Sequence, residues 1–263
     1  SRGLGDVYKR QIKDVKDKNS TYIEQLAFVS PEERSAALAL ADRIVAGEKL
    51  SEKIEDLVPL VLRRSDTATD VAMFGRMLAD NPDFNREAAV QVAHAITTHR
   101  VEVEDDFYTA IDDLKKPAED AGAGFIGELS FGSGVFYIYA CVDRDLLEHN
   151  LGGDKQLAAT SIAALLEGLS TSSPTGKQAS FASRARANYL RIEKGAQQPR
   201  SLAAAFFKPV KGDDLLASSI EEMEKTALRM DKAYGPCADT HRVMNALIGE
   251  GSLAELIEFA VAE

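Results

Sequence analysis

The chain has 263 residues, 45% of them hydrophobic, which is enough for one large domain or two modest ones with a real core. Its formal net charge of −11 argues at first sight against a nucleic-acid partner, because a phosphate backbone attracts cations. The two cysteines, Cys141 and Cys237, cannot make a disulfide framework, and no apolar run is long enough to span a membrane, so we expect a soluble, cytoplasmic protein without a membrane partner.

The chain opens on Ser1 to Gln11, which resemble translated adapter sequence, so we leave residues 1–11 out of the fold and expect a natural N-terminal portion to be missing. A helix start follows at Ser30, Pro31 and Glu33, which supply a capping hydroxyl, a proline at the first helical position and a glutamate three residues after the cap. We expect this helix to run to about Ala46.

Two further elements precede the centre of the chain. A second helix is predicted over 51–64, bent or divided at Pro59. The apolar segment 70–74 favours a short strand that enters Gly75-Arg76-Met77.

The centre of the chain is predicted to form a protruding hairpin. Apolar and polar residues alternate over 90–96 and again over 135–141, the period of a strand with unlike faces. The segment between them is rich in Asp and Glu, and unpaired carboxylates are too costly to bury. Phe107 and Tyr108 lie on this acidic segment, where they either stack on a partner or pin the loop to its own domain.

The rest of the chain alternates helical and extended patterns. Helices are predicted over 143–150, 155–169, 213–234 and 253–261, and an extended segment over 180–192. Together with the central strands, this pattern indicates an α+β fold without internal repeats.

Charge is unevenly distributed along the chain. The window 170–211 holds eight Lys and Arg residues and one Glu, a net charge of +7, which leaves −18 for the remainder. Such a basic segment is either a track for a polyanion or a solvated face that pairs with an acidic neighbour.

Several apparent motifs do not match their chemistry. The glycine pattern at 122–127 follows a polar loop and opens a strand-like run, whereas a dinucleotide site leaves a strand and opens a helix. Gly176-Lys177-Gln178 lacks the first glycine and the final Ser or Thr of a phosphate loop. The carboxylate pairs 105–106 and 112–113 could hold a metal, but such loop carboxylates are usually solvated. We predict no catalytic residue, metal or cofactor.

Seven blocks occur in an order that resembles one family. They are DVAMFGRM at 70–77, AHAITTH at 93–99, DFYTAIDDL at 106–114, SGVFYIYACVD at 133–143, NLGG at 150–153, PTGKQASFA at 174–182 and PRSLAAAFFKPV at 199–210. In this order the blocks closely resemble the CasC family, the repeated backbone subunit of the type I-E CRISPR Cascade complex.

The resemblance implies a fold and a division of the chain. It implies an RRM-like (ferredoxin-like) palm with a helical fingers insertion and a protruding β-hairpin thumb. On this basis the fingers are predicted over 12–88, the palm over 89–100 and 125–263, and the thumb over 101–124.

The resemblance also implies RNA-binding residues. Phe107 and Tyr108 match the thumb aromatics that wedge beside a displaced guide base, with Thr109 nearby, and Met77 matches a methionine that packs against bases beside the kink. A glycine-lysine-glutamine loop implies backbone and phosphate contacts; its residues here are Gly176, Lys177, Gln178 and Ser180.

The implied function is antiviral defence by a ribonucleoprotein. Family members cleave nothing: they polymerise along the CRISPR RNA (crRNA), kink it periodically and present it to a target DNA strand. The implied partners are crRNA, that DNA strand, neighbouring copies of the chain and the other Cascade subunits. Two alternatives stay open: a related subunit that cleaves target RNA with Asp105 or Asp106 and a metal, and a protein–protein assembly module that binds no RNA.

Overall fold

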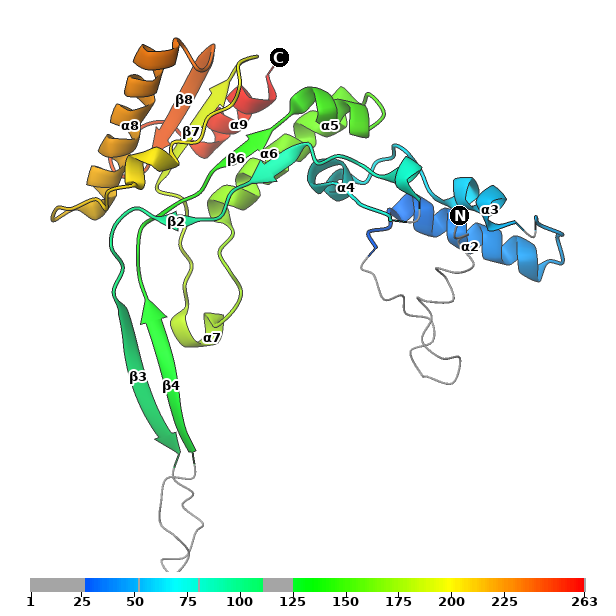
Figure 1. The fold of residues 1–263 in the computed structure, drawn as a ribbon, viewed down its shortest axis with the longest axis horizontal. Helices are drawn as coiled ribbons and strands as arrows, with labels where there is room; N and C mark the ends of the chain where they lie inside the picture. Colours follow the sequence, from blue (N-terminus) through cyan, green and yellow to red (C-terminus); the bar gives the residue numbers. More distant parts are fainter. Residues whose placement is uncertain (1–26, 52, 80, 111–124, 263) are drawn as a thin grey trace, which may run out of the picture. The chain divides into compact units, whose positions relative to one another are not determined.

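The computed structural model describes residues 27–51, 53–79, 81–110 and 125–262 (Figure 1). The chain divides into two compact units, and each is described by itself. Unit 1 comprises the described residues of Ser1–Gln91, Ala140–Ile192 and Arg242–Glu263, and unit 2 those of Val92–Tyr139 and Glu193–His241.

Unit 1 is mainly helical. Its helices are α2 (Pro31–Val45), α3 (Ile54–Val61), α4 (Thr69–Phe74), the 3-10 helix η1 (Pro82–Phe84), α5 (Arg144–Asn150), α6 (Lys155–Thr171), α7 (Gln178–Phe181) and α9 (Leu253–Val261). The short strands β1 (Val90–Val92) and β6 (Ala140–Val142) form a two-stranded sheet.

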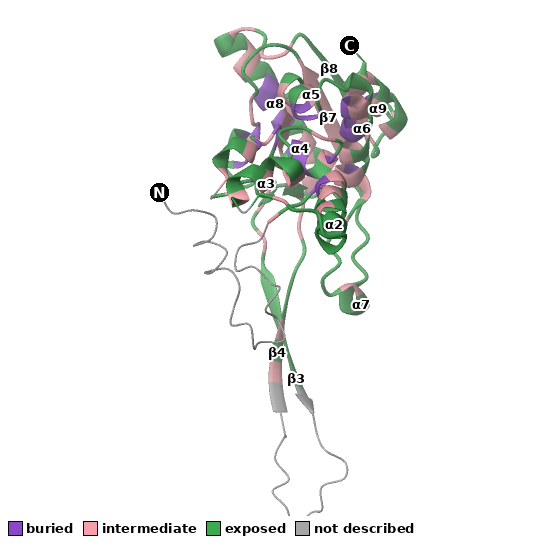
Figure 2. Ribbon diagram, turned by 90° about the vertical axis from the view of Figure 1, so that its right-hand side faces the viewer, coloured by how far each residue is buried: buried purple, intermediate pink, exposed green. Residues whose placement is uncertain are grey.

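The core of unit 1 lies where α4, α5 and α6 meet. Ala72, Leu147 and Ala158, one from each helix, are fully buried in one apolar cluster (buried residues are purple in Figure 2). Asn150 at the end of α5 donates from Nδ2 to the carbonyl oxygens of Ala72 and Glu87, at 3.0 and 2.9 Å. These hydrogen bonds satisfy the buried amide and tie α5 to the chain around α4.

The capping box predicted at Ser30 is present, and the structure adds two further side-chain caps. The Ser30 hydroxyl accepts from the Glu33 N–H at 3.1 Å and the Glu33 carboxylate accepts from the Ser30 N–H at 3.0 Å, which confirms the capping box of α2. Asp143 and Asp154 accept from backbone N–H groups at the starts of α5 and α6. The helices predicted from residue 143 onward are confirmed to within two residues at each end.

Two local predictions are wrong. The segment predicted as a strand over 70–74 is the helix α4, whose N–H groups bond four residues back, as from Ala72 to Ala68 at 2.9 Å. A run of so few apolar residues does not distinguish the periodicity of a helix from that of a strand, so packing against α5 decides its conformation. The segment predicted as extended over 180–192 begins with the last turn of α7 and becomes a strand only at β7 (Tyr189–Lys194).

The strands predicted over 90–96 and 135–141 are each present as two short strands, β1 and β2 (Ile96–Thr97) at the first range and β5 (Phe136–Tyr137) and β6 at the second. In unit 2, β2 pairs antiparallel with β5. The long hairpin is formed by residues between these ranges. β3 (Val103–Ala110) and β4 (Phe125–Gly132) form an antiparallel ladder of eight residue pairs, drawn as two long adjacent arrows in Figure 1. The second strand of this hairpin lies beyond residue 124, where the predicted thumb range ends.

The remaining elements complete a mixed α+β fold. In unit 2, α8 (Leu215–Tyr234) packs on the 3-10 helix η2 (Ala203–Phe206). β7 pairs with β8 (Thr240–Asn245), and the described residues thus form four two-stranded sheets. None of the helices in the described part of the chain is both long and apolar enough to cross a membrane.

Candidate nucleic-acid interface

Met77 projects from a rigid part of unit 1 and is 80% exposed. It follows Gly75, which ends α4 with a φ of +77°, and Arg76, which exchanges backbone hydrogen bonds with Arg86 at 3.0 and 2.9 Å. A side chain on Gly75 would meet the Arg86 carbonyl oxygen at 2.9 Å, so only glycine fits this approach. The backbone on the N-terminal side of Met77 is therefore fixed while its thioether remains in solvent.

Two buried ion pairs hold this region. Arg76 Nη1 lies 2.6 Å from Glu33 Oε2 and Arg86 Nη1 lies 2.7 Å from Asp66 Oδ1, with every side chain at most 1% exposed. The Arg76 guanidinium also donates to the carbonyl oxygens of Phe28, Arg63 and Phe84. This hydrogen bonding offsets part of the cost of removing water from the charges, since Nε of each arginine and Oδ2 of Asp66 have no hydrogen-bond partner among the described residues.

The same contacts shift both carboxyl groups. Burial would raise the pKa of Glu33, but the hydrogen bonds from Arg76 and from the Arg63 and Ser30 N–H groups outweigh it and lower the pKa. Burial acts on Asp66 in the same way, and the hydrogen bond from Arg86 leads the contacts that lower its pKa. Both carboxylates therefore stay charged inside unit 1 at neutral pH.

The hairpin of unit 2 places Phe107 and Tyr108 of β3 on opposite faces. Phe107 is paired with Glu128 and Tyr108 with Gly127, and successive side chains of a strand point to opposite faces. Phe107 is 68% exposed and Tyr108 is 51% exposed. The Tyr108 ring lies over Gly127, where any side chain would come within 2.4 Å of the ring. The two rings thus serve opposite faces of the ribbon.

The described part of the hairpin is acidic throughout. Glu104, Asp105, Asp106 and Glu128 lie on it, and its described strand residues include no Lys or Arg. Asp105 accepts a hydrogen bond from the Ser130 hydroxyl at 2.8 Å. Phosphate would be repelled here, so a nucleic acid could meet this hairpin only through its bases.

Part of the predicted thumb site lies outside what the structure describes. Thr109 is placed as a backbone position of β3 opposite Ile126, but its side chain is not among those described. Asp112 and Asp113, considered for a metal, lie outside the described residues. Among the described residues, no three or more His, Cys, Asp or Glu side chains form a group that could hold a metal ion.

The glycine-lysine-glutamine loop of unit 1 is held by Gln178. Lys177 adopts the left-handed conformation, with a φ of 59°, and its side chain is exposed. The Gln178 side-chain amide donates to the carbonyl oxygens of Pro174 and Ser183, which closes the loop across its base. Both partners are acceptors, so the amide orientation is fixed and its donors are already used. Gly176 and Ser180 are exposed beside it.

Gln178 therefore shapes this loop, and Lys177 is its exposed cation.

The basic segment predicted over 170–211 has one fewer available cation than the sequence suggests, because Arg200 is only 7% exposed and pairs with Glu193 and Asp231 at 2.7 and 2.8 Å. Phe107 and Tyr108 lie in unit 2, whereas Met77 and the loop belong to unit 1.

Sequence reasoning missed the positioning residues Arg76 and Gly127. An arginine inside an apolar block and a glycine inside a strand pattern were the available signals, since each residue type is unusual in that setting.

The comparisons with known proteins agree with each other. The model of the CT1975-like protein family matches residues 3–258. A solved structure titled "CRISPR RNA-guided surveillance complex, pre-nicking" is similar with a TM-score of 0.78 and 29% identity, over 98% of this chain and 77% of that one. A second, titled "CRISPR RNA-guided surveillance complex", gives a TM-score of 0.63 and 28% identity, over 89% and 85% of the two chains. No curated protein matches the chain.

Proposed function

The chain belongs to the CT1975-like protein family, and from this we propose that it is a non-catalytic backbone subunit of a type I-E Cascade complex that polymerises along crRNA. The observation that carries the proposal is the similarity to subunits of CRISPR RNA-guided surveillance complexes over 98% and 89% of the chain. On this proposal unit 1 and unit 2 supply the fingers, an RRM-like palm and the thumb.

The hairpin geometry supports a particular form of RNA contact. Because Phe107 and Tyr108 face opposite sides of one ribbon, we propose that the hairpin enters between two segments of the guide and contacts one base with each ring. Aromatic stacking tolerates any base, so guide sequence would not matter. Carboxylates around the rings keep phosphates away and favour base contacts.

The remaining predicted residues fit a division of labour. Lys177 is an exposed cation for a phosphate, while Gln178 shapes the turn around it. Met77 offers a flexible, polarizable side chain to a base beside the kink. The bases between kinks would then be presented to a target DNA strand, and sequence specificity would come from base pairing, as described for another CRISPR effector.

The test is to express the chain with the other Cascade subunits and a CRISPR array, then purify the complex and sequence the RNA it retains. Guide-length RNA in a large complex is expected. A folded complex without RNA would refute RNA binding and favour the assembly module. Magnesium-dependent cleavage of paired RNA, lost in Asp106→Asn, would instead favour the cleaving subunit.

Single substitutions test the two-faced wedge. Phe107→Ala and Tyr108→Ala are each expected to weaken RNA binding about 5- to 150-fold, the equivalent of about 1 to 3 kcal/mol for each stacked base. Phe207→Ala removes another exposed ring of unit 2 that has no assigned role and serves as the control. An effect of only one hairpin substitution would restrict the contact to one face.

A further inference from the structure

A depression of about 440 Å³ lies in unit 1 beside the end of α6. It is formed by the last turn of α6, the extended segment 184–188, the end of β8 and the start of α9. Two backbone hydrogen bonds fix its frame: Ala187 N–H donates to Ser170 O at 2.9 Å, and Ala246 N–H donates to Asn188 O at 2.8 Å. These two bonds hold the segment 184–188 between the end of α6 and the residue that follows β8.

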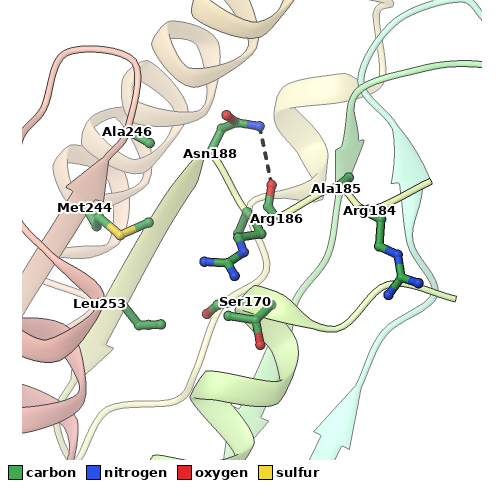
Figure 3. Close-up of a pocket in the computed structure, with 10 residues that line it drawn as sticks. Ser170, Arg184, Ala185, Arg186, Asn188, Met244, Ala246 and Leu253 are labelled. Atoms are coloured by element: carbon green, nitrogen blue, oxygen red, sulfur yellow. Dashed lines mark hydrogen bonds between the residues drawn. The ribbon is translucent and has the colours of Figure 1, made fainter. Parts of the chain in front are cut away.

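The two sides of this depression differ in chemistry. Met244, Ala246 and Leu253 line one side with apolar atoms. Figure 3 shows the Arg186 guanidinium directed into the space between Ser170 and Leu253, with Arg184 at the opposite rim. Cation and apolar wall therefore face the same space.

The charge of the two arginines is not balanced locally. Among the described residues, none that lines the depression is acidic, and none makes an ion pair with Arg184 or Arg186. The Ser170 hydroxyl donates its proton to the Leu166 carbonyl oxygen at 2.6 Å, so it is not available to bind an anion, and the guanidinium of Arg186 is the donor in this space. The depression suits an anion.

A nucleotide matches both sides at once. The planar guanidinium of Arg186 can hold a phosphate through two parallel hydrogen bonds, and the thioether of Met244 beside Leu253 offers an apolar surface to a flat base. The volume lies within the range of small-molecule sites. A bare inorganic anion would leave the apolar wall unused, and a metal cation would be repelled.

The surrounding chain relates the depression to RNA. Thr171 and Arg184, the two ends of the segment that contains Lys177, both line the depression. The depression therefore lies at the base of the loop that is proposed to contact RNA. We infer that the depression binds one nucleotide of single-stranded RNA, with its phosphate on Arg186 and its base against Met244 and Leu253. This inference rests on the proposed function and adds Arg186, Met244 and Leu253 to its RNA contacts.

The experiment measures binding of a 5′-labelled single-stranded RNA to the full chain by fluorescence anisotropy over a series of salt concentrations. Arg186→Gln is expected to weaken binding about 5-fold or more and to reduce the log–log salt slope by about 0.7, the loss of one phosphate contact. Arg34→Gln makes the same charge change on an exposed position of α2 and should leave the slope unchanged. Met244→Ser should weaken binding about 5-fold without altering the slope, because it removes apolar contact only.

The outcomes separate this inference from the proposed function. Wild-type protein that binds no RNA would overturn both. Wild-type binding with Arg186→Gln indistinguishable from Arg34→Gln would overturn this inference alone. If Arg186→Gln abolishes binding of uridine monophosphate but not of RNA, the site takes a free nucleotide and the RNA assignment is wrong. Photocrosslinking of RNA that contains 4-thiouridine should label the peptide around Met244, and labelling confined to other segments would contradict the site.

Discussion

Replacing Arg76 by methionine should destabilise unit 1 severely. The substitution removes the guanidinium that lies 2.6 Å from Glu33 and also donates to three backbone carbonyl oxygens. Glu33 keeps only the N–H groups of Ser30 and Arg63, at 3.0 and 2.8 Å, and becomes a buried charge without a counter-ion. Breaking such a pair costs about 3 to 5 kcal/mol, a large share of the stability of an ordinary domain.

The assay is urea unfolding at pH 7 followed by far-UV circular dichroism. Arg43→Met makes the same substitution in the exposed pair with Glu48, where both side chains are 47% exposed, and its effect should be far smaller. The double variant Glu33→Gln with Arg76→Met should recover part of the loss, because the unpaired buried charge of Glu33 is then removed and only the paired charges of Arg86 and Asp66 stay buried.

Three results would count against this reasoning. An Arg76→Met loss no larger than that of Arg43→Met would show that the buried pair contributes little. A double variant that is less stable than Arg76→Met alone would show that the uncompensated charge is not the cause. If Arg76→Met does not fold, Arg76→Lys provides the measurement, and a stability equal to wild type would refute the need for several simultaneous hydrogen bonds.

Three further predictions concern the same framework. Gly75→Ala should cost about 2 to 4 kcal/mol in urea unfolding, because it combines a positive φ with a backbone clash against Arg86; Gly168→Ala, in open space within α6, should instead raise stability by about 0.5 to 1 kcal/mol, and equal losses would contradict the clash. Gln178→Ala should speed amide hydrogen exchange over 173–183 with little change in global stability, and unchanged exchange would show that the amide does not hold the loop. The pKa values of Glu33 and Asp66 in the folded protein lie below the ordinary values of 4.5 and 3.8, so their charged forms contribute fully to the free energy of unfolding above about pH 4.5, and this contribution is lost as the pH falls through the lowered values. The free energy of unfolding of Glu33→Gln should therefore fall less steeply than that of wild type between pH 5 and 3. Parallel curves for the two proteins would contradict this linkage.

The local signals in the sequence were sufficient for most helices. Ser30 with Glu33 predicted the start of α2, because these side chains satisfy N–H groups that have no partner within the helix. The alternation around the hairpin likewise predicted strands, since one face of each strand meets a different environment. The family resemblance came from ordered blocks along the chain, and the comparisons support it.

Tertiary structure decided what the local signals left open. The apolar run at 70–74 became a helix because Ala72 packs against Leu147, a partner 75 positions away that no local pattern shows. From the sequence alone, Arg76 is expected on the surface. In the structure, its contacts with Glu33 and with the carbonyl groups of Phe28, Arg63 and Phe84 offset the free-energy cost of burying its charge. Phe107 and Tyr108 were read as one pair until strand register placed them on opposite faces. The burial of a side chain, its ion-pair partner and the sheet face on which it lies depend on contacts between residues distant in sequence. Sequence periodicity alone therefore cannot predict them.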